Sequence, residues 1–213
     1  LNETLQLGFT GSVYEGLLGR DKNMALTPLL ATKWSQKSPT VWRFELRKGV
    51  KFHDDTPFTA DDVLFTFNRM ARDDHPFHKV SGGSYDYWGD LGLNKLVASI
   101  DKVDPYTSSF KEVRKIDDHT IEIETIAPNP ILPDVISIVG MMSKKWCEQN
   151  KAEKPVDRRK GIENTASFKA NGTGPFRLKE RQPSVRTVLT RNFSYWDNVT
   201  SDNGLVLKKS QTF

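Results

Sequence analysis

The chain has 213 residues, of which 37% are hydrophobic, 27% are charged and one is a cysteine. A chain of this length buries roughly 70% of its unfolded surface, so it can form a core without a metal or a disulfide. Lysine and arginine number 31 against 27 aspartates and glutamates, and the two signs are interleaved, which argues against nucleic-acid binding. No window approaches the roughly 18 consecutive apolar residues of a membrane span, so the sequence predicts no such helix.

A strand is predicted where apolar and charged residues alternate. Trp42, Phe44 and Leu46 fall on one face with charged residues between them, as in a sheet that has one face in water. After a turn at residues 48–49 the alternation resumes up to Phe52. We therefore expect this segment to form half of an antiparallel sheet.

An amphipathic helix is predicted from Thr59 onward. Thr59 is a favourable N-cap residue, and Asp62 supplies a carboxylate three positions later, where the first amides of a helix need an acceptor. The apolar residues that follow recur at helical spacing and form one stripe: Val63, Leu64, Phe67, Met70 and Ala71. We expect the helix to end near Arg72 and its stripe to pack on the apolar face of the Trp42 strand.

The remaining elements are predicted from shorter patterns. A strand over residues 121–125 ends before two prolines, which cannot donate ladder hydrogen bonds. We further expect a short helix before Gly16, a helix opened by Pro133, another over residues 141–150, and a hairpin of residues 176–178 with 185–190. Residues 73–92 are interpreted as a structured loop and residues 151–166 as a charged connector.

Residues 100–107 nearly repeat as residues 113–120. Each copy indicates a strand, an aspartate-rich turn and a threonine that opens the next strand. The spacing of thirteen residues is shorter than the roughly 20 residues of a solenoid unit. A duplicated hairpin and a splice between related sequences both remain open as explanations.

We find no enzyme signature in the sequence. The motifs of serine hydrolases, zinc peptidases, dinucleotide-binding folds and P-loop enzymes are absent. His75 and His78 lie near carboxylates, but the proline between them disrupts a regular ligand spacing. Cys147 has no histidine placed by sequence to activate it, so we interpret it as a partly buried helix thiol. We therefore assign no catalytic residue, no metal and no cofactor.

A glycine-rich segment, residues 172–175, has the sequence Gly-Thr-Gly-Pro. It lacks the lysine of a nucleotide-binding loop, and it leads into a predicted strand rather than a helix. We interpret it as a tight turn that lets another segment or a ligand approach the backbone closely.

Several of these segments together resemble one protein family. Residues 13–17 (VYEGL), 42–54 (WRFELRKGVKFHD) and 56–63 (TPFTADDV) are similar, in this order, to the extracellular solute-binding proteins of family 5. Residues 171–176 (NGTGPF), followed by Tyr-Trp at residues 195–196, resemble the next landmark of that family. Its members are the dipeptide, oligopeptide and nickel receptors of ABC importers.

The resemblance covers about residues 10–198 and implies the N-terminal lobe of a two-lobed receptor. We therefore expect a mixed α/β fold of α+β character, like a lobe of a type II periplasmic binding protein. Residues 1–213 are expected to form a single lobe with an inserted subdomain at residues 35–170, and the second lobe is expected to be absent. The chain begins at Leu1 without a leader pattern, which is typical of a mature form or an excised fragment.

The resemblance also implies a function. We expect the substrate-binding component of an ABC importer, and residues 78–83 (HKVSGG) resemble the dipeptide branch. The implied ligand-binding residues are Phe9, Thr10, Gly11, Ser12, Tyr14, Gly172, Thr173 and Gly174. The implied partners are a small peptide-like solute and the membrane subunits of a permease. We expect a monomer in the periplasm or outside the cell, with or without a membrane tether. The alternative is a truncated, chimeric or engineered lobe that keeps the fold and binds little or no ligand.

Overall fold

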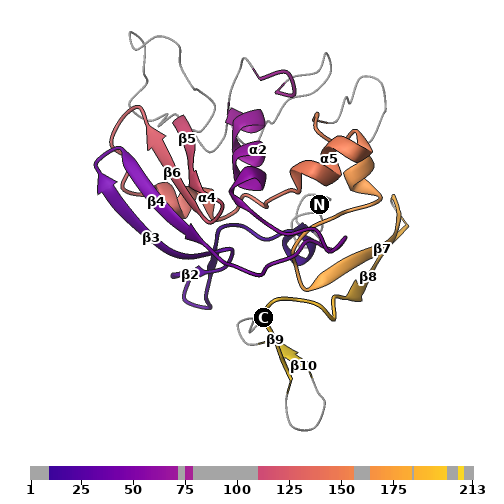
Figure 1. Ribbon diagram of the computed structural model, residues 1–213. Coiled ribbons are helices and arrows are strands. Elements are labelled where there is room, and N and C mark those ends of the chain that lie inside the picture. Colours follow the sequence, from indigo (N-terminus) through magenta and orange to yellow (C-terminus); the bar gives the residue numbers. More distant parts are fainter. Residues whose placement is uncertain are drawn as a thin grey trace.

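The computed structural model describes residues 10–71, 75–78, 110–155, 164–183, 185–200 and 206–208. A four-stranded antiparallel sheet in the order β3-β4-β6-β5 is drawn in purple and pink in Figure 1. Its strands are β3 (Ala31–Ser38), β4 (Val41–Leu46), β5 (Phe110–Asp117) and β6 (Thr120–Thr125). Helices accompany this sheet, so the expected mixed character of the fold is confirmed.

The two central strands, β4 and β6, follow the alternation of their sequences. Phe44 of β4 pairs with Ile121 of β6, and both side chains are fully buried. Successive side chains of a strand point to opposite faces. The adjacent pair, Arg43 and Glu122, accordingly forms an ion pair of 2.7 Å on the other face. The period-two prediction is confirmed for both strands.

The partner of β4 differs from the expectation. Val50 and Phe52 lie outside the strands of the sheet, and Lys51 forms only an isolated bridge with Pro57. The prediction that the sheet continues past the turn was therefore wrong. Gly49 adopts a positive φ of 76°, which redirects the chain, and the two apolar residues enter the core from a loop. β4 pairs instead with β3, a largely polar strand that the sequence pattern did not predict.

Helix α2 (Ala60–Ala71) begins and ends close to the expected residues. The Asp62 carboxylate accepts a hydrogen bond from the Thr59 amide at 2.9 Å, which is the reach-back half of a capping box. Its second oxygen accepts from the Lys144 amide at 2.9 Å. Phe67 is fully buried and stacks on Phe110 of β5, with 5.5 Å between ring centroids. The helix therefore packs on the sheet through β5.

The helix stripe and the apolar face of β4 share one core. Val63 and Phe67 belong to the same buried cluster as Phe44 and Leu46. The stripe therefore shares a core with the apolar face of the Trp42 strand, as expected, but its direct packing on the sheet is through β5. Within the described residues, no helix is both long enough and apolar enough to cross a bilayer.

The rest of the described chain consists of short elements. Residues 10–13 are helical. The short helices are α4 (Leu132–Ile136), α5 (Lys144–Asn150) and the 3-10 helix η3 (Thr165–Ser167). The hairpins are β1–β2 (Leu18–Arg20, Leu26–Pro28), β7–β8 (Phe176–Gln182, Arg186–Arg191) and β9–β10 (Asn198–Thr200, Val206–Lys208). The expected short helices and the 176–190 hairpin are confirmed. In Figure 1, α2 lies between the sheet and α5.

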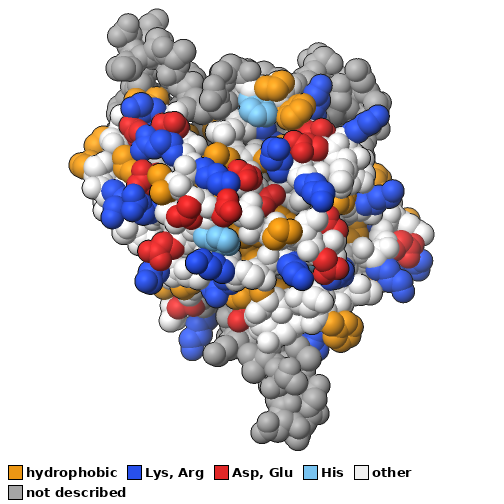
Figure 2. Space-filling model, viewed as in Figure 1, with side chains coloured by type: hydrophobic (Ala, Val, Ile, Leu, Met, Phe, Trp, Pro, Cys, Tyr) orange, Lys and Arg blue, Asp and Glu red, His pale blue; other side chains and the backbone are white. Residues whose placement is uncertain are grey.

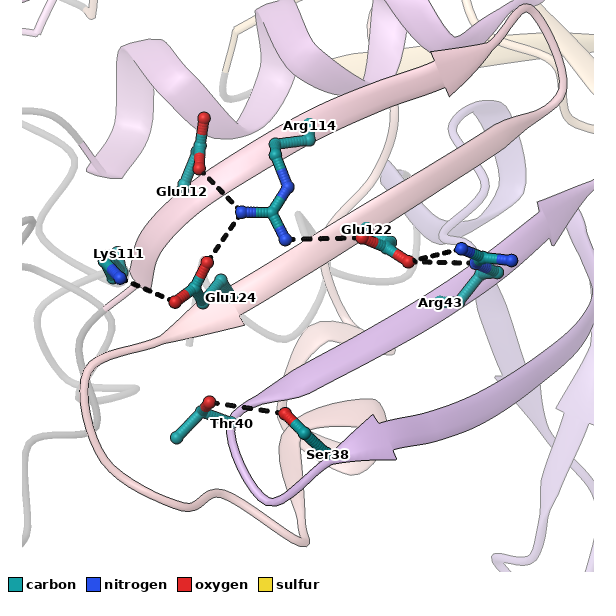
Figure 3. Close-up of polar contacts among 8 residues, drawn as sticks. All are labelled: Ser38, Thr40, Arg43, Lys111, Glu112, Arg114, Glu122 and Glu124. Atoms are coloured by element: carbon teal, nitrogen blue, oxygen red, sulfur yellow. Dashed lines mark hydrogen bonds and ion pairs between the residues drawn. The ribbon is translucent and has the colours of Figure 1, made fainter.

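A row of alternating charges crosses the outer face of the sheet (Figure 3). Its members are Lys111, Glu124, Arg114, Glu112, Glu122 and Arg43. Arg114 is the centre of the row and donates to three carboxylates on β5 and β6. The three cations balance the three carboxylates, and Figure 2 shows both signs mingled over the visible face. This arrangement is typical of a solvated sheet face rather than of a nucleic-acid surface.

Several expectations lie wholly or partly outside the described residues: most of the 73–92 loop with its 78–83 motif, the first repeat copy at residues 100–107, residues 156–163 of the charged connector, and the position of Phe9. The second repeat copy, residues 113–120, forms the end of β5, a turn and the start of β6. That copy therefore has the structure that its sequence predicts.

Candidate functional site

A pocket of about 290 Å³ opens beside residues 10–19. Residues 137–140 supply the other part of its wall. The lining includes Thr10, Gly11, Tyr14, Gly16, Ser137 and Ile138. The pocket is therefore built mainly from two segments that are far apart in the sequence, and Leu29 completes its lining.

Close backbone contact fixes residues 137–140 in place. The Met141 amide donates a hydrogen bond to the Glu15 carbonyl at 2.8 Å. A Cβ at Gly16 would lie 2.6 Å from the Ser137 carbonyl oxygen, so glycine is required at this contact. The VYEGL segment thus brings the second part of the wall against the first.

Glu15 also lines the pocket, and its buried carboxylate is held by hydrogen bonds from other segments. Glu15 is only 4% exposed. It accepts hydrogen bonds from the Thr173 hydroxyl (2.9 Å), the Tyr195 hydroxyl and the Trp196 indole nitrogen (2.9 Å). Burial, and next the nearby Glu15 carboxylate, raise the pKa of Tyr195 and keep it a donor. The Arg47 guanidinium lies over the Trp196 ring, 4.1 Å from its centroid. These partners offset the cost of burying a carboxylate.

The predicted Gly-Thr-Gly segment, here called the 172–174 turn, packs directly behind residues 12 and 13. The Gly174 amide donates to the Val13 carbonyl at 2.9 Å. A Cβ at Gly172 would lie 2.0 Å from the same carbonyl oxygen, so only glycine fits there. The segment that approaches this turn closely is therefore the chain's own backbone.

The structure brings the two predicted groups of binding residues together but gives them different positions. Thr10, Gly11 and Tyr14 line the pocket, whereas Ser12 is half-buried next to the lining residues. The 172–174 turn is buried, and its threonine hydroxyl already donates to Glu15. In this arrangement the turn supports the wall from behind.

Sequence reasoning missed a large part of the wall. Gly16, Ser137, Ile138 and Gly140 line the pocket, and none of them was predicted as a site residue. Gly16 belongs to the VYEGL segment, which offered a signal. Residues 137–140 show no local pattern, because their place depends on the contact with Gly16.

Apart from Glu15, whose carboxylate is buried and hydrogen-bonded, the residues that line the pocket are neutral. Its polar groups include the hydroxyls of Thr10 and Ser137, and its apolar groups include Ile138, which is 65% exposed. Burial raises the pKa of Tyr14 above its usual range, so this phenol stays neutral. The Glu15 carboxylate accepts hydrogen bonds from Thr173, Tyr195 and Trp196. Such a surface can form hydrogen bonds with a solute backbone and cover an apolar side chain.

A second, more open depression of about 440 Å³ lies beside the turn between β5 and β6. Its lining carries both signs, with Lys48 and His119 beside Glu45 and Asp117. The Asp117 carboxylate accepts the His119 amide of its own turn at 2.7 Å. Exposed charges of this kind remain solvated and contribute little to binding. Among the described residues, no cluster of three or more metal-ligating side chains is present.

The fold is that of part of a solute-binding protein. The chain belongs to the bacterial extracellular solute-binding proteins of family 5, because the family description "Bacterial extracellular solute-binding proteins, family 5 Middle" matches residues 25–209. The resemblance inferred from the motifs is therefore confirmed.

Curated relatives show the same membership. The dipeptide-binding protein of Escherichia coli (strain K12) is 33% identical over 178 residues, which are 79% of this chain and 30% of the relative. The periplasmic oligopeptide-binding protein OppA of Salmonella typhimurium is 30% identical over 197 residues, 87% of this chain and 32% of the relative. The chain thus spans about a third of the length of these relatives.

Solved structures confirm the fold. The periplasmic binding protein DppA from Helicobacter pylori, in complex with the peptide STSA, has a TM-score of 0.70 and 25% identity, and the match covers 88% of this chain and 35% of that one. A dipeptide-binding protein from Pseudoalteromonas sp. SM9913, in complex with Met-Leu, has a TM-score of 0.66 and 26% identity, covering 87% and 34%. The expected likeness to type II periplasmic binding proteins is confirmed.

Proposed function

We propose that this chain is part of the substrate-binding component of an ABC importer. In this proposal its pocket forms one wall of a site for a small peptide or a similar solute. The observation that carries the proposal is the wall built by residues 10–19 and 137–140, in which the charged lining residue, Glu15, has its carboxylate engaged by other side chains of the chain. Peptides share a backbone and differ in side chains, so a receptor that reads backbone groups suits them.

Named relatives support a peptide-like ligand. The Escherichia coli relative is a dipeptide-binding protein, and the Pseudoalteromonas structure holds Met-Leu. We extend this ligand class to the present chain, with Thr10, Gly11, Ser12 and Tyr14 at the wall and the 172–174 turn as its support. The charged ends of a peptide need charged partners, so we place their recognition outside this otherwise neutral wall.

We also propose a domain organisation. Residues 35–170 form a subdomain inserted between two segments that together build one lobe. The bonds from Thr173 and Trp196 to Glu15 support this, because they join the segments on either side of the insertion. A second lobe, in this proposal, supplies the facing wall and closes over the solute.

The proposed role is binding without chemical turnover. Cys147, the only cysteine of the chain, is fully buried, and burial raises the pKa of its thiol to about 12. A thiol in that state is a poor nucleophile at neutral pH. This supports a receptor, which needs affinity and release rather than a reactive group.

The proposed setting is the periplasm or the outside of the cell, where a monomeric receptor delivers its solute to the membrane subunits of a permease. The names of relatives support this setting. OppA of Salmonella typhimurium is described as periplasmic, and DppA of Helicobacter pylori as associated with an ABC transporter.

The affinity of this chain alone is expected to be low. With one wall, a dipeptide keeps much of its hydration, and each hydrogen bond contributes only about 0.5–1.5 kcal/mol. Association costs at least about 4 kcal/mol in lost freedom of motion. We therefore expect a dissociation constant of roughly millimolar or weaker.

The test is a titration of the ¹⁵N-labelled chain with the dipeptide Met-Leu, followed by amide chemical shifts. We expect shifts at Thr10, Gly11, Gly16 and Gly140. Ile138→Asp places a charge on the otherwise neutral wall and should abolish the shifts. Ile131→Asp is the matched control: Ile131 lies at the other end of α4 and is 60% exposed, against 65% for Ile138, and it does not line the pocket.

Each outcome of this titration is informative. Shifts confined to the second depression around Lys48 and His119 would contradict the proposed wall. An absence of shifts at several times the expected millimolar constant would favour a lobe that keeps the fold without binding. Micromolar binding would show that one wall suffices and that the second lobe contributes less to the affinity than proposed.

A further inference from the structure

His53 lies in the loop between β4 and α2 and is 8% exposed. Its contacts reach the far end of the chain. The His53 amide donates to the Gly172 carbonyl at 2.9 Å, and its ring nitrogen Nε2 lies 2.9 Å from the Gly174 carbonyl oxygen. The other ring nitrogen, Nδ1, lies 3.4 Å from the Gly172 amide nitrogen. One imidazole therefore contacts both glycines of the 172–174 turn.

This geometry fixes the protonation state of the ring. A carbonyl oxygen only accepts hydrogen bonds, so Nε2 must carry the proton that points to Gly174. A backbone amide only donates, so Nδ1 must hold the lone pair that faces Gly172. The two conditions together require the neutral Nε2–H tautomer of His53.

The turn that His53 holds is in direct contact with the pocket wall. Gly174 donates to the Val13 carbonyl, and a Cβ at Gly172 would come within 3.0 Å of Tyr14 Cδ1. Tyr14 lines the pocket. The 172–174 turn thus contacts both His53 and residues 13–14.

We infer that His53 is a positioning residue: its neutral ring holds the 172–174 turn against residues 12–14, and its protonation releases the turn and loosens the pocket wall. The effect on ligand binding rests on the proposed function, whereas the effect on the turn does not.

Protonation would disrupt the contact in a defined way. A proton on Nδ1 would face the Gly172 N–H, so Gly172 loses its acceptor and two donors oppose each other, whereas the Nε2–H bond to Gly174 is kept. Release of the turn therefore begins at Gly172. The charged groups that face His53 are Arg177 of β7, which donates to the His53 carbonyl at 2.6 Å, and the adjacent Asp54. Burial lowers the pKa of His53, Arg177 lowers it further, and the Gly174 carbonyl and Asp54 oppose this. The release is therefore expected below the usual pKa of 6.5.

The first test uses NMR on the unmodified chain. Long-range ¹H–¹⁵N spectra of the His53 ring should show the Nε2–H tautomer at neutral pH and titration below 6.5. As His53 titrates, the protection factors of the Gly172 and Gly174 amides, which correct for the pH dependence of intrinsic exchange, should fall about 3- to 10-fold, while amides of β4 and β6 keep their protection. The Nδ1–H tautomer, or equal loss of protection in the sheet, would overturn the inference.

The second test uses two matched variants. His53→Gln cannot titrate but keeps one donor and one acceptor, so its turn amides should lose the acid response. His78→Gln is the control, because His78 is also buried but contacts the Arg69 carbonyl at 3.0 Å and not the turn. An unchanged acid response in His53→Gln would contradict the positioning role.

A third measurement separates this inference from the proposed function. The Met-Leu titration is repeated above and below the midpoint of His53. Weaker binding on the acid side, restored in His53→Gln, supports both ideas. Acid release of the turn without any peptide binding at neutral pH would remove the proposed function and leave the positioning role intact. Unchanged peptide binding after release of the turn would overturn the link to the pocket wall.

Discussion

The indole N–H of Trp196 donates a hydrogen bond to the Glu15 carboxylate at 2.9 Å, across 181 positions of the chain. This bond joins the segment that builds the pocket wall to the last part of the chain before β9. Glu15, in the middle of the VYEGL segment, therefore binds residues that are distant in the sequence, and no local sequence pattern predicts these contacts. The first prediction tests that role.

Replacing Glu15 should strongly destabilise the fold. Glu15→Ala leaves the buried hydroxyls of Thr173 and Tyr195 without this acceptor, and each orphaned buried donor costs about 1–3 kcal/mol. We expect a loss of about 3 kcal/mol or more in the free energy of unfolding, and a smaller loss for Glu15→Gln, which keeps one carbonyl oxygen. Urea titration followed by circular dichroism measures this. Glu45→Ala, at an exposed position, is the control and should stay within about 0.5 kcal/mol.

The contact between α2 and the sheet predicts a large effect at Phe67. This side chain is 0% exposed and stacks on Phe110, so Phe67→Ala should cost about 3–5 kcal/mol. Phe193 is 77% exposed, and Phe193→Ala should change stability by less than about 0.5 kcal/mol. Denaturant unfolding of both variants gives the comparison. A loss below about 1 kcal/mol for Phe67→Ala would place the helix elsewhere.

Two adjacent aspartates should differ sharply. Asp62 is buried and accepts amides from both Thr59 and Lys144, so it serves the starts of two helices. Asp62→Ala should cost about 2 kcal/mol through lost capping and unpaired amides. Asp61 is exposed and pairs with Lys115, and Asp61→Ala should cost less than about 1 kcal/mol. Thermal and urea unfolding measure the stability of both variants. Equal losses of stability would refute the role of Asp62 at the starts of both helices.

The charge row of the sheet predicts part of the loss of folding stability in acid. Hydrogen bonds from Lys111 and then Arg114 lower the pKa of Glu124 below its usual 4.5. The folded state therefore binds this proton less readily than the unfolded state, so the stabilisation is present above pH 4.5 and is lost as the pH falls through the lowered pKa. Glu124→Gln should be less stable than the parent at about pH 6, where carboxylates are ionised. The difference should shrink towards about pH 3, where they become protonated.

Two controls test whether charge causes this pH-dependent difference in stability. High salt should reduce the difference at pH 6, because partly exposed charges are screened. A double-mutant cycle with Arg114→Gln should show coupling between the two residues at pH 6 that disappears in acid. A stability difference that does not depend on pH would assign the effect to packing instead of charge.

Elements whose signals are local could be predicted from the sequence. The strands around Phe44 and Ile121 and the helix from Thr59 were all predictable, because side-chain alternation and helix capping depend on residues within a few positions. The motif segments also identified the family, since they lie in order along the chain. The Gly-Thr-Gly turn was predictable as a turn, because glycine tolerates close backbone approach.

The tertiary structure alone decided how these elements meet. β3 is too polar to show a strand pattern, and it forms because β4 offers a free edge for backbone pairing. Residues 137–140 became part of the pocket through contact with Gly16, and the 172–174 turn came to rest on residues 12 and 13. Sequence periodicity reports which face of an element is apolar. It does not report which distant backbone will satisfy a buried carbonyl, amide or carboxylate, and in this protein those long-range polar contacts at Glu15 and His53 build the site.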